Sequence, residues 1–144
     1  MVIKSLNMQI TNRFFSSFFR NIIVLIAVLI LSYMTASWLG QIYKYVFPSE
    51  FVGGLFSVPT QEATWIVGFP LDYILFLTGL FTIFGGKGKY WWIGILLIPA
   101  AVVEIYFDLP HIYFPVILGV IGWGIGYLIS RFLSQGSLPP QSST

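Results

Sequence analysis

The sequence predicts an all-α integral membrane protein, a bundle of four transmembrane helices. Of its 144 residues, 57% are hydrophobic and 8% are charged, whereas a soluble domain has about 25% charged residues. So few charges cannot cover a surface that faces water. The apolar residues also gather in four runs, each long enough to cross a bilayer core of about 30 Å. We expect these spans at residues 21–38, 65–84, 90–107 and 112–132.

The charged residues alternate between the two sides of these runs. Six of the seven basic residues precede the first run, separate the second from the third, or end the fourth: Lys4, Arg13, Arg20, Lys87, Lys89 and Arg131. The acidic residues lie in or beside the other connections, with only Lys44 among them: Glu50, Glu62, Asp72, Glu104 and Asp108. Because cytoplasmic loops carry the excess of Lys and Arg, the sequence predicts both termini in the cytoplasm, N-in and C-in. The expected location is a plasma membrane or a bacterial inner membrane.

The composition also excludes several classes of site and partner. The chain has no cysteine, so it has neither a disulfide framework nor thiolate chemistry. Its single histidine, His111, rules out a zinc site built from several histidines. The basic residues mark topology and form no patch for nucleic acid. We therefore expect no cofactor, no metal and no nucleic-acid partner.

The chain is predicted to form one domain, residues 1–134, followed by a disordered cytoplasmic tail at 135–144 that is rich in Ser and Pro. The first apolar run is expected to be a retained signal anchor, because it is longer than the core of a cleaved signal peptide. Before it, residues 12–21 place four phenylalanines on one helical face and two arginines with two serines on the other. This pattern fits either an interfacial amphipathic helix or the first turns of a long first span.

The connection at residues 39–65 is long for so small a protein. It is rich in aromatic residues and is interrupted by two prolines and two adjacent glycines. We expect it to lie on the outer membrane surface as an aromatic anchor belt, in preference to a ligand-binding lid. A short helix at 49–55 is expected within it, capped by Ser49.

Two tight turns are expected further along the chain. The glycine-rich segment at 85–89 lacks the GxxxxGK[ST] spacing of a phosphate-binding loop, so we interpret it as a cytoplasmic turn. Residues 108–110 make the short outer turn. Pro70 is expected either to kink the second span or to lie in its first turn.

Small residues recur along one face of the fourth span. Gly119, Gly122, Gly126 and Ser130 follow Pro115 at helical spacing, and Gly122 and Gly126 form a GxxxG pair. Small residues let helices approach closely in a membrane. A matching face on the first span consists of Ser32, Ala36 and Gly40. The two faces either pack on each other within one chain or form a groove for another subunit.

A polar constellation is predicted in the outer third of the membrane. Asp72 lies sixteen residues before Gly88 and Glu104 sixteen after it, so an antiparallel hairpin places both about 20 Å above the cytoplasmic boundary. Two close carboxyls at low dielectric would share a proton or hold a cation. Asp108 lies one turn above Glu104. The alternative is that these are rim acids hydrogen-bonded to tyrosines. The expected neighbours of the acids are Tyr73, Tyr106, Thr35 and Ser37.

Glu104, Asp108 and His111 also follow one another at metal-ligand spacing, but Pro110 breaks the helix before His111. No nucleophile is paired with a base, so the sequence predicts that the protein is not an enzyme. The leading expectation is a membrane component that packs against itself, as a homo-oligomer, or against another membrane protein, within the lipid bilayer. The alternative is a proton- or cation-linked transporter or channel built around Asp72 and Glu104.

Overall fold

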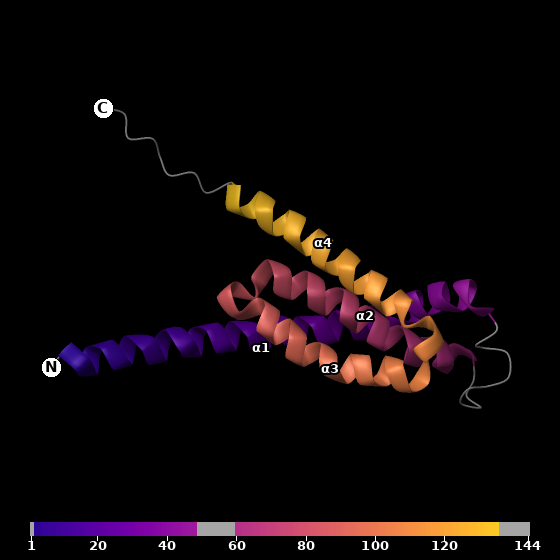
Figure 1. The fold of residues 1–144 in the computed structure, drawn as a ribbon, viewed down its shortest axis with the longest axis horizontal. Helices are drawn as coiled ribbons and strands as arrows, with labels where there is room; N and C mark the ends of the chain where they lie inside the picture. Colours follow the sequence, from indigo (N-terminus) through magenta and orange to yellow (C-terminus); the bar gives the residue numbers. More distant parts are fainter. Residues whose placement is uncertain (1, 49–59, 136–144) are drawn as a thin grey trace.

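The computed structural model describes residues 2–48 and 60–135, and their side chains from residues 16 and 61 onward. This part of the chain is entirely helical (Figure 1). Its elements are α1 (Val2–Val46), α2 (Thr60–Phe84), the 3₁₀ turn η2 (Gly86–Gly88), α3 (Lys89–Phe107), the 3₁₀ turn η3 (Leu109–His111) and α4 (Tyr113–Gln135). The four α-helices are each long and apolar enough to cross a membrane. The predicted all-helical membrane class with four spans is confirmed at this level.

Helix α1 is longer than the sequence predicts. It runs without interruption from Val2 to Val46, a length of about 68 Å at 1.5 Å per residue, twice a bilayer core. Residues 12–21 therefore lie within one continuous helix, with no break between them and the first apolar run. The helix also passes the predicted end at residue 38, because Gly40 packs closely on α2 and the buried Tyr43 joins an aromatic core with Phe47.

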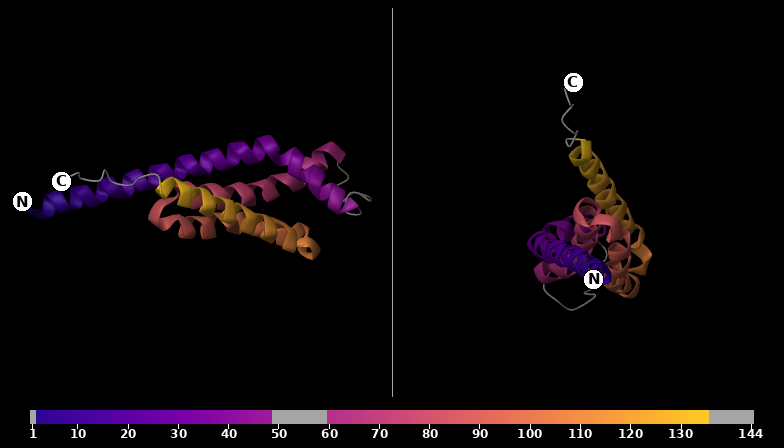
Figure 2. Two further views of the ribbon diagram at one scale, coloured as in Figure 1. Left: turned by 90° about the horizontal axis from the view of Figure 1, so that it is seen from above. Right: turned by 90° about the vertical axis from the view of Figure 1, so that its left-hand side faces the viewer.

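Helix α2 is the centre of the bundle. Of the residues in its apolar stretch, 44% are buried, against 28% in α1 and 17% in each of α3 and α4. It packs against all three other helices (Figures 1 and 2). It begins at Thr60, five residues earlier than expected, and Pro70 lies well inside it rather than in the first turn. The expected short helix at 49–55 and the tail after residue 135 lie outside the described residues.

The seam between α1 and α2 is made by small residues. A side chain at Gly40 would collide with the Thr64 carbonyl, and one at Gly68 with the Ala36 carbonyl. The two backbones are therefore in direct contact, as small residues permit in a membrane.

The seam between α2 and α4 has the same character. A Cβ atom at Gly126 would lie 2.5 Å from the Gly79 carbonyl oxygen, and one at Gly122 would collide with the Leu75 carbonyl. The sequence left two alternatives for the small faces of α1 and α4. The first of them, that the two faces pack on each other, is wrong, because each packs on α2. Helix α4 diverges from the bundle toward its C-terminal end (Figures 1 and 2).

A tight turn joins α2 and α3 at the predicted residues. Gly86 adopts a φ of 65°, which favours glycine. The Lys89 Nζ atom donates to the Thr82 carbonyl at 2.7 Å and so caps the C-terminal end of α2. Helix α3 then ends at Phe107, the residue expected from the sequence.

Candidate functional site

An apolar crevice opens between α2, α3 and α4, near the end of the bundle that carries η3. Its volume is about 340 Å³, within the range of about 300 to 1,000 Å³ that is usual for ligand sites. Aliphatic side chains, Pro115, Gly119 and Trp123 make up most of the wall. The hydroxyl of Thr78 also lines the crevice, but it donates to the carbonyls of its own helix at 2.8 and 3.1 Å. The crevice is thus an apolar space with few polar groups available to a ligand.

Glu104 supplies the only charge in this wall. Its side chain is 6% exposed, and no residue in the described part of the chain donates a hydrogen bond to its carboxyl group. Every fully enclosed side-chain polar atom among those residues has a partner, so the Glu104 oxygens are not fully enclosed. The residue itself lines the crevice. A buried polar group without a partner is costly. Glu104 can therefore accept a hydrogen bond, or pair with a cation, from whatever occupies the crevice.

Asp72 lies in a different seam of the bundle. Its side chain is 3% exposed, and the Thr35 hydroxyl on α1 donates to its Oδ2 atom at 2.9 Å. Thr35 is one of the neighbours that the sequence indicated. Asp72 thus has a partner within the chain, whereas Glu104 does not.

The helical geometry of α2 separates the two acids. Ile74 and Thr78 line the crevice with Glu104, and they follow Asp72 by about 200° and 240° around the helix. Asp72 therefore faces α1 while Glu104 lies beside the opposite face of α2. Asp72 and Glu104 are equally far from Gly88 along the chain, and this predicted that they lie at the same level along the bundle axis. It did not predict on which side of α2 each residue lies.

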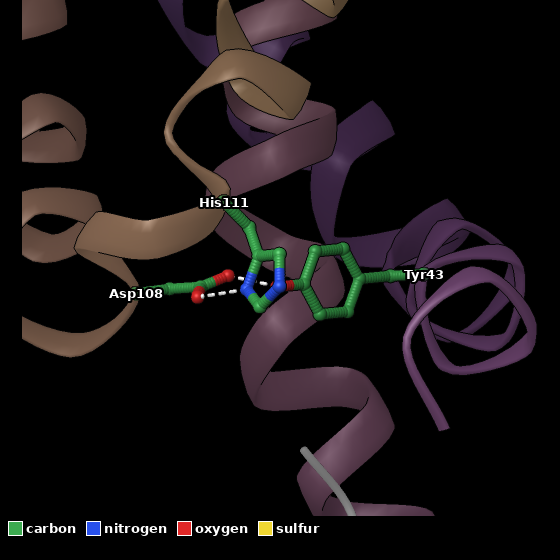
Figure 3. A network of polar contacts seen from close by, with 3 residues as sticks. All are labelled: Tyr43, Asp108 and His111. Atoms are coloured by element: carbon green, nitrogen blue, oxygen red, sulfur yellow. Dashed lines mark hydrogen bonds and ion pairs between the residues drawn. The ribbon is translucent and has the colours of Figure 1, made fainter. Parts of the chain in front are cut away.

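A second cluster of polar side chains surrounds Asp108, which follows the last residue of α3. Asp108 accepts hydrogen bonds from the Tyr43 hydroxyl on α1 and from the imidazole Nδ1 of His111, the latter at 2.6 Å (Figure 3). The contact joins α1 to the α3–α4 connection. The His111 ring also lies 4.2 Å from the Phe47 ring, centroid to centroid, so aromatic side chains hold the imidazole in place.

The structure brings Asp108 and His111 together but leaves Glu104 in the crevice. Among the residues that the structure describes, no three acidic, histidine or cysteine side chains are grouped as metal ligands. Tyr43, whose hydroxyl completes the contact with Asp108, was not among the residues predicted for this site. The available signal was the aromatic spacing of Tyr43 and Phe47, which also fits a helix that continues beyond residue 38.

Comparison with known proteins finds no match for this chain among family models, curated proteins or solved structures. Function must therefore be inferred from the crevice and the polar groups themselves. The described site can bind an apolar body that carries a hydrogen-bond donor.

Proposed function

We propose that this chain is a non-enzymatic membrane component that docks a transmembrane helix of another membrane protein into the crevice between α3 and α4. The docked helix presents a basic or hydroxyl side chain to Glu104. The chain lies in a plasma membrane or bacterial inner membrane, with both termini in the cytoplasm, as the charge pattern favours. The observation that carries the proposal is the buried carboxyl of Glu104 in an otherwise apolar crevice.

The surroundings of Glu104 support a helix as the occupant. Helices α3 and α4 both pack mainly on α2 and expose apolar faces along most of their length. Lipid chains give helices no hydrophobic drive to associate, so close packing and interhelical hydrogen bonds decide which surfaces pair. An acidic side chain within a membrane usually has a partner and a use. A helix with a matching donor supplies both packing and the missing hydrogen bond.

The small-residue faces support another protein rather than a second copy as the partner. Gly122 and Gly126 on α4, and Gly40 on α1, already pack on α2 within the chain. They hold the bundle together and are not available for close pairing with a second bundle. The docking surface is therefore assigned to the crevice.

Site-directed cross-linking tests this proposal, because the chain has no cysteine of its own. Val116 lines the crevice and Ile117 does not, yet both are about half exposed. A photoreactive probe on Val116→Cys, activated in native membranes, should give one defined adduct that the Ile117→Cys protein lacks. The Glu104→Ala change should abolish this adduct, because it removes the acceptor.

The mass of the adduct decides between partners. A mass equal to two copies of the chain would replace the proposed partner by self-association. Equal labelling from both cysteines, or an adduct that survives Glu104→Ala, would reject the crevice as a docking site.

The second candidate function is proton or cation transport. It is favoured by the burial of both Asp72 and Glu104 within membrane-spanning helices. Purified protein in vesicles with an internal pH dye would then carry protons, and Asp72→Asn and Glu104→Gln would each stop the flux. The exposed Glu62 gives the control, since Glu62→Gln removes the same charge outside the bundle core. Flux equal to that of empty vesicles would exclude this function.

A further inference from the structure

The opposite end of the bundle, at the α2–α3 turn, is basic. Arg20, Lys87 and Lys89 gather there from α1, η2 and the start of α3. The described part of α1 contains no acidic residue, and Asp72, the nearest acid of α2, lies twelve residues before Phe84, about 18 Å along the helix. The local field therefore favours an anion.

A groove of about 540 Å³ leads from Arg20 between α1 and α2. Apart from Arg20 and Ser16, the residues that line it are apolar: Phe19, Ile23, Val24, Ala27, Leu80 and Phe84. Ala27 follows Arg20 by seven residues, so the groove extends about 10 Å along the helix axis. It thus joins a cationic entrance to an apolar floor, which suits a molecule with an anionic head and a hydrocarbon chain.

Arg20 is held at this entrance by its neighbours. Its Nη2 atom contacts the Ser17 hydroxyl at 3.4 Å, and a side chain at Gly86 would collide with the guanidinium. Because Gly86 has no side chain, Arg20 can lie against the turn that also carries Lys87. A guanidinium has five N–H donors, so most of them stay available, and its planar shape matches phosphate oxygens.

Behind Arg20, the structure is fixed by hydrogen bonds. In the amide orientation that satisfies both neighbours, Asn21 donates to the Gly85 carbonyl at 3.3 Å and accepts from the Trp92 indole at 2.8 Å. Asn21 is buried, so α1 and the turn keep their relative position. The backbone that carries the entrance is therefore in place before a ligand binds.

We propose that this groove is a binding site for one anionic phospholipid. The phosphate lies at Arg20, with Lys87 providing further positive charge, and one acyl chain follows Ile23 and Ala27 between α1 and α2. This site is separate from the Glu104 crevice, and the proposal does not depend on the docking function.

Native mass spectrometry of the full chain in mild detergent tests the site. The protein is titrated with phosphatidylglycerol or phosphatidylcholine of the same acyl composition, and the retained lipid is counted. Phosphatidylglycerol should bind about tenfold more tightly, because the choline ammonium of phosphatidylcholine offsets the negative phosphate charge near Arg20 and Lys87. Arg20→Gln removes one of these positive charges and should remove most of the difference. Arg131→Gln removes the same charge from the exposed end of α4 and should keep the preference.

A second pair of variants tests the groove without changing charge. Ala27→Phe fills it and should weaken phosphatidylglycerol binding, whereas Gly124→Phe adds the same ring where nothing lies within 4 Å of the added Cβ atom and should have no effect. Equal binding of the two lipids, or equal losses in Arg20→Gln and Arg131→Gln, would overturn the proposal. Displacement of the lipid by inorganic phosphate, or unchanged binding in Ala27→Phe, would also overturn it, since the acyl chain would then contribute nothing.

Discussion

Gly122 sets the distance between α4 and α2. A Cβ atom there would lie 3.2 Å from the Leu75 carbonyl carbon and closer still to its oxygen, whereas Gly124 has nothing within 4 Å. Gly122→Leu should therefore destabilise the bundle by about 1–3 kcal/mol or more, the usual cost of overpacking. Gly124→Leu should change stability by less than about 1 kcal/mol in either direction. Unfolding in increasing SDS measures both, and equal losses would show that α4 packs through another face.

Tyr43 ties α1 to the α3–α4 connection through Asp108. Tyr43→Phe keeps the buried ring and removes only the hydroxyl, so stability should fall by about 0.5–1.5 kcal/mol. Tyr45, two residues on, is 88% exposed, and Tyr45→Phe should have no measurable effect. The same SDS titration compares the two variants. A Tyr43→Phe protein as stable as the parent would show that the hydroxyl contact contributes nothing net.

Thr35 is the only hydrogen-bond donor to the Asp72 carboxyl in the described part of the chain. Thr35→Val preserves the shape of the side chain and leaves the buried acid without a partner, which should cost about 1–3 kcal/mol. Asp72→Asn in the same background should recover part of this loss, because the amide no longer needs the hydroxyl as strongly as a carboxylate does. Independent, additive effects of the two changes would contradict the contact.

At the scale of the helix, composition and periodicity predicted α3 well and α1 poorly. Helix α3 begins after a glycine-rich turn and ends before Pro110, so strong local signals fix both ends. The C-terminal end of α1 has no such signal between residues 38 and 46. Its last turns are stabilised by contacts with distant residues, such as Thr64 and Phe114, which the local sequence does not reveal.

The candidate site was also predicted only in part, because contacts between distant residues decide its arrangement. Counting residues from the Gly88 turn identified Asp72 and Glu104 as buried acids of the membrane region. Counting could not show which helices each acid lies between, because that requires knowing that α2 lies between α1 and α4. The small-residue faces likewise predicted close helix contact, but not that α2 is the common partner.

The faces of α3 give a prediction about lipid exposure. Ile98 is 58% exposed and Ala100, two residues later, is 5% exposed. A spin label on Ile98→Cys should be strongly relaxed by oxygen dissolved in the membrane, and one on Ala100→Cys should be protected. If α3 instead packed against a partner along its whole outer face in native membranes, the Ile98 label would be protected too, and that result would move the docking surface from the crevice to α3.

For the whole molecule, the start of α1, the η2 turn and the end of α4 lie at one end of the bundle, with η3 at the other (Figure 1). Combined with the distribution of Lys and Arg, this arrangement predicts that a reporter fused after Thr144 is cytoplasmic. A reporter inserted near Gly53 should be external. Enzymatic reporters that are active on only one side of the membrane measure both fusions, and an external C-terminal reporter would reject the proposed orientation.

The central position of α2 has a consequence for biogenesis. The first 84 residues contain both α1 and α2, whose shared seam is the most extensive in the described part of the chain. This pair can dock as soon as the second hydrophobic segment has left the ribosome, before α3 enters the bilayer. Helices α3 and α4 then each join a surface that already exists, and neither needs the other as a template. Insertion into the bilayer can thus proceed in the order of translation, without a late rearrangement of segments already in the membrane.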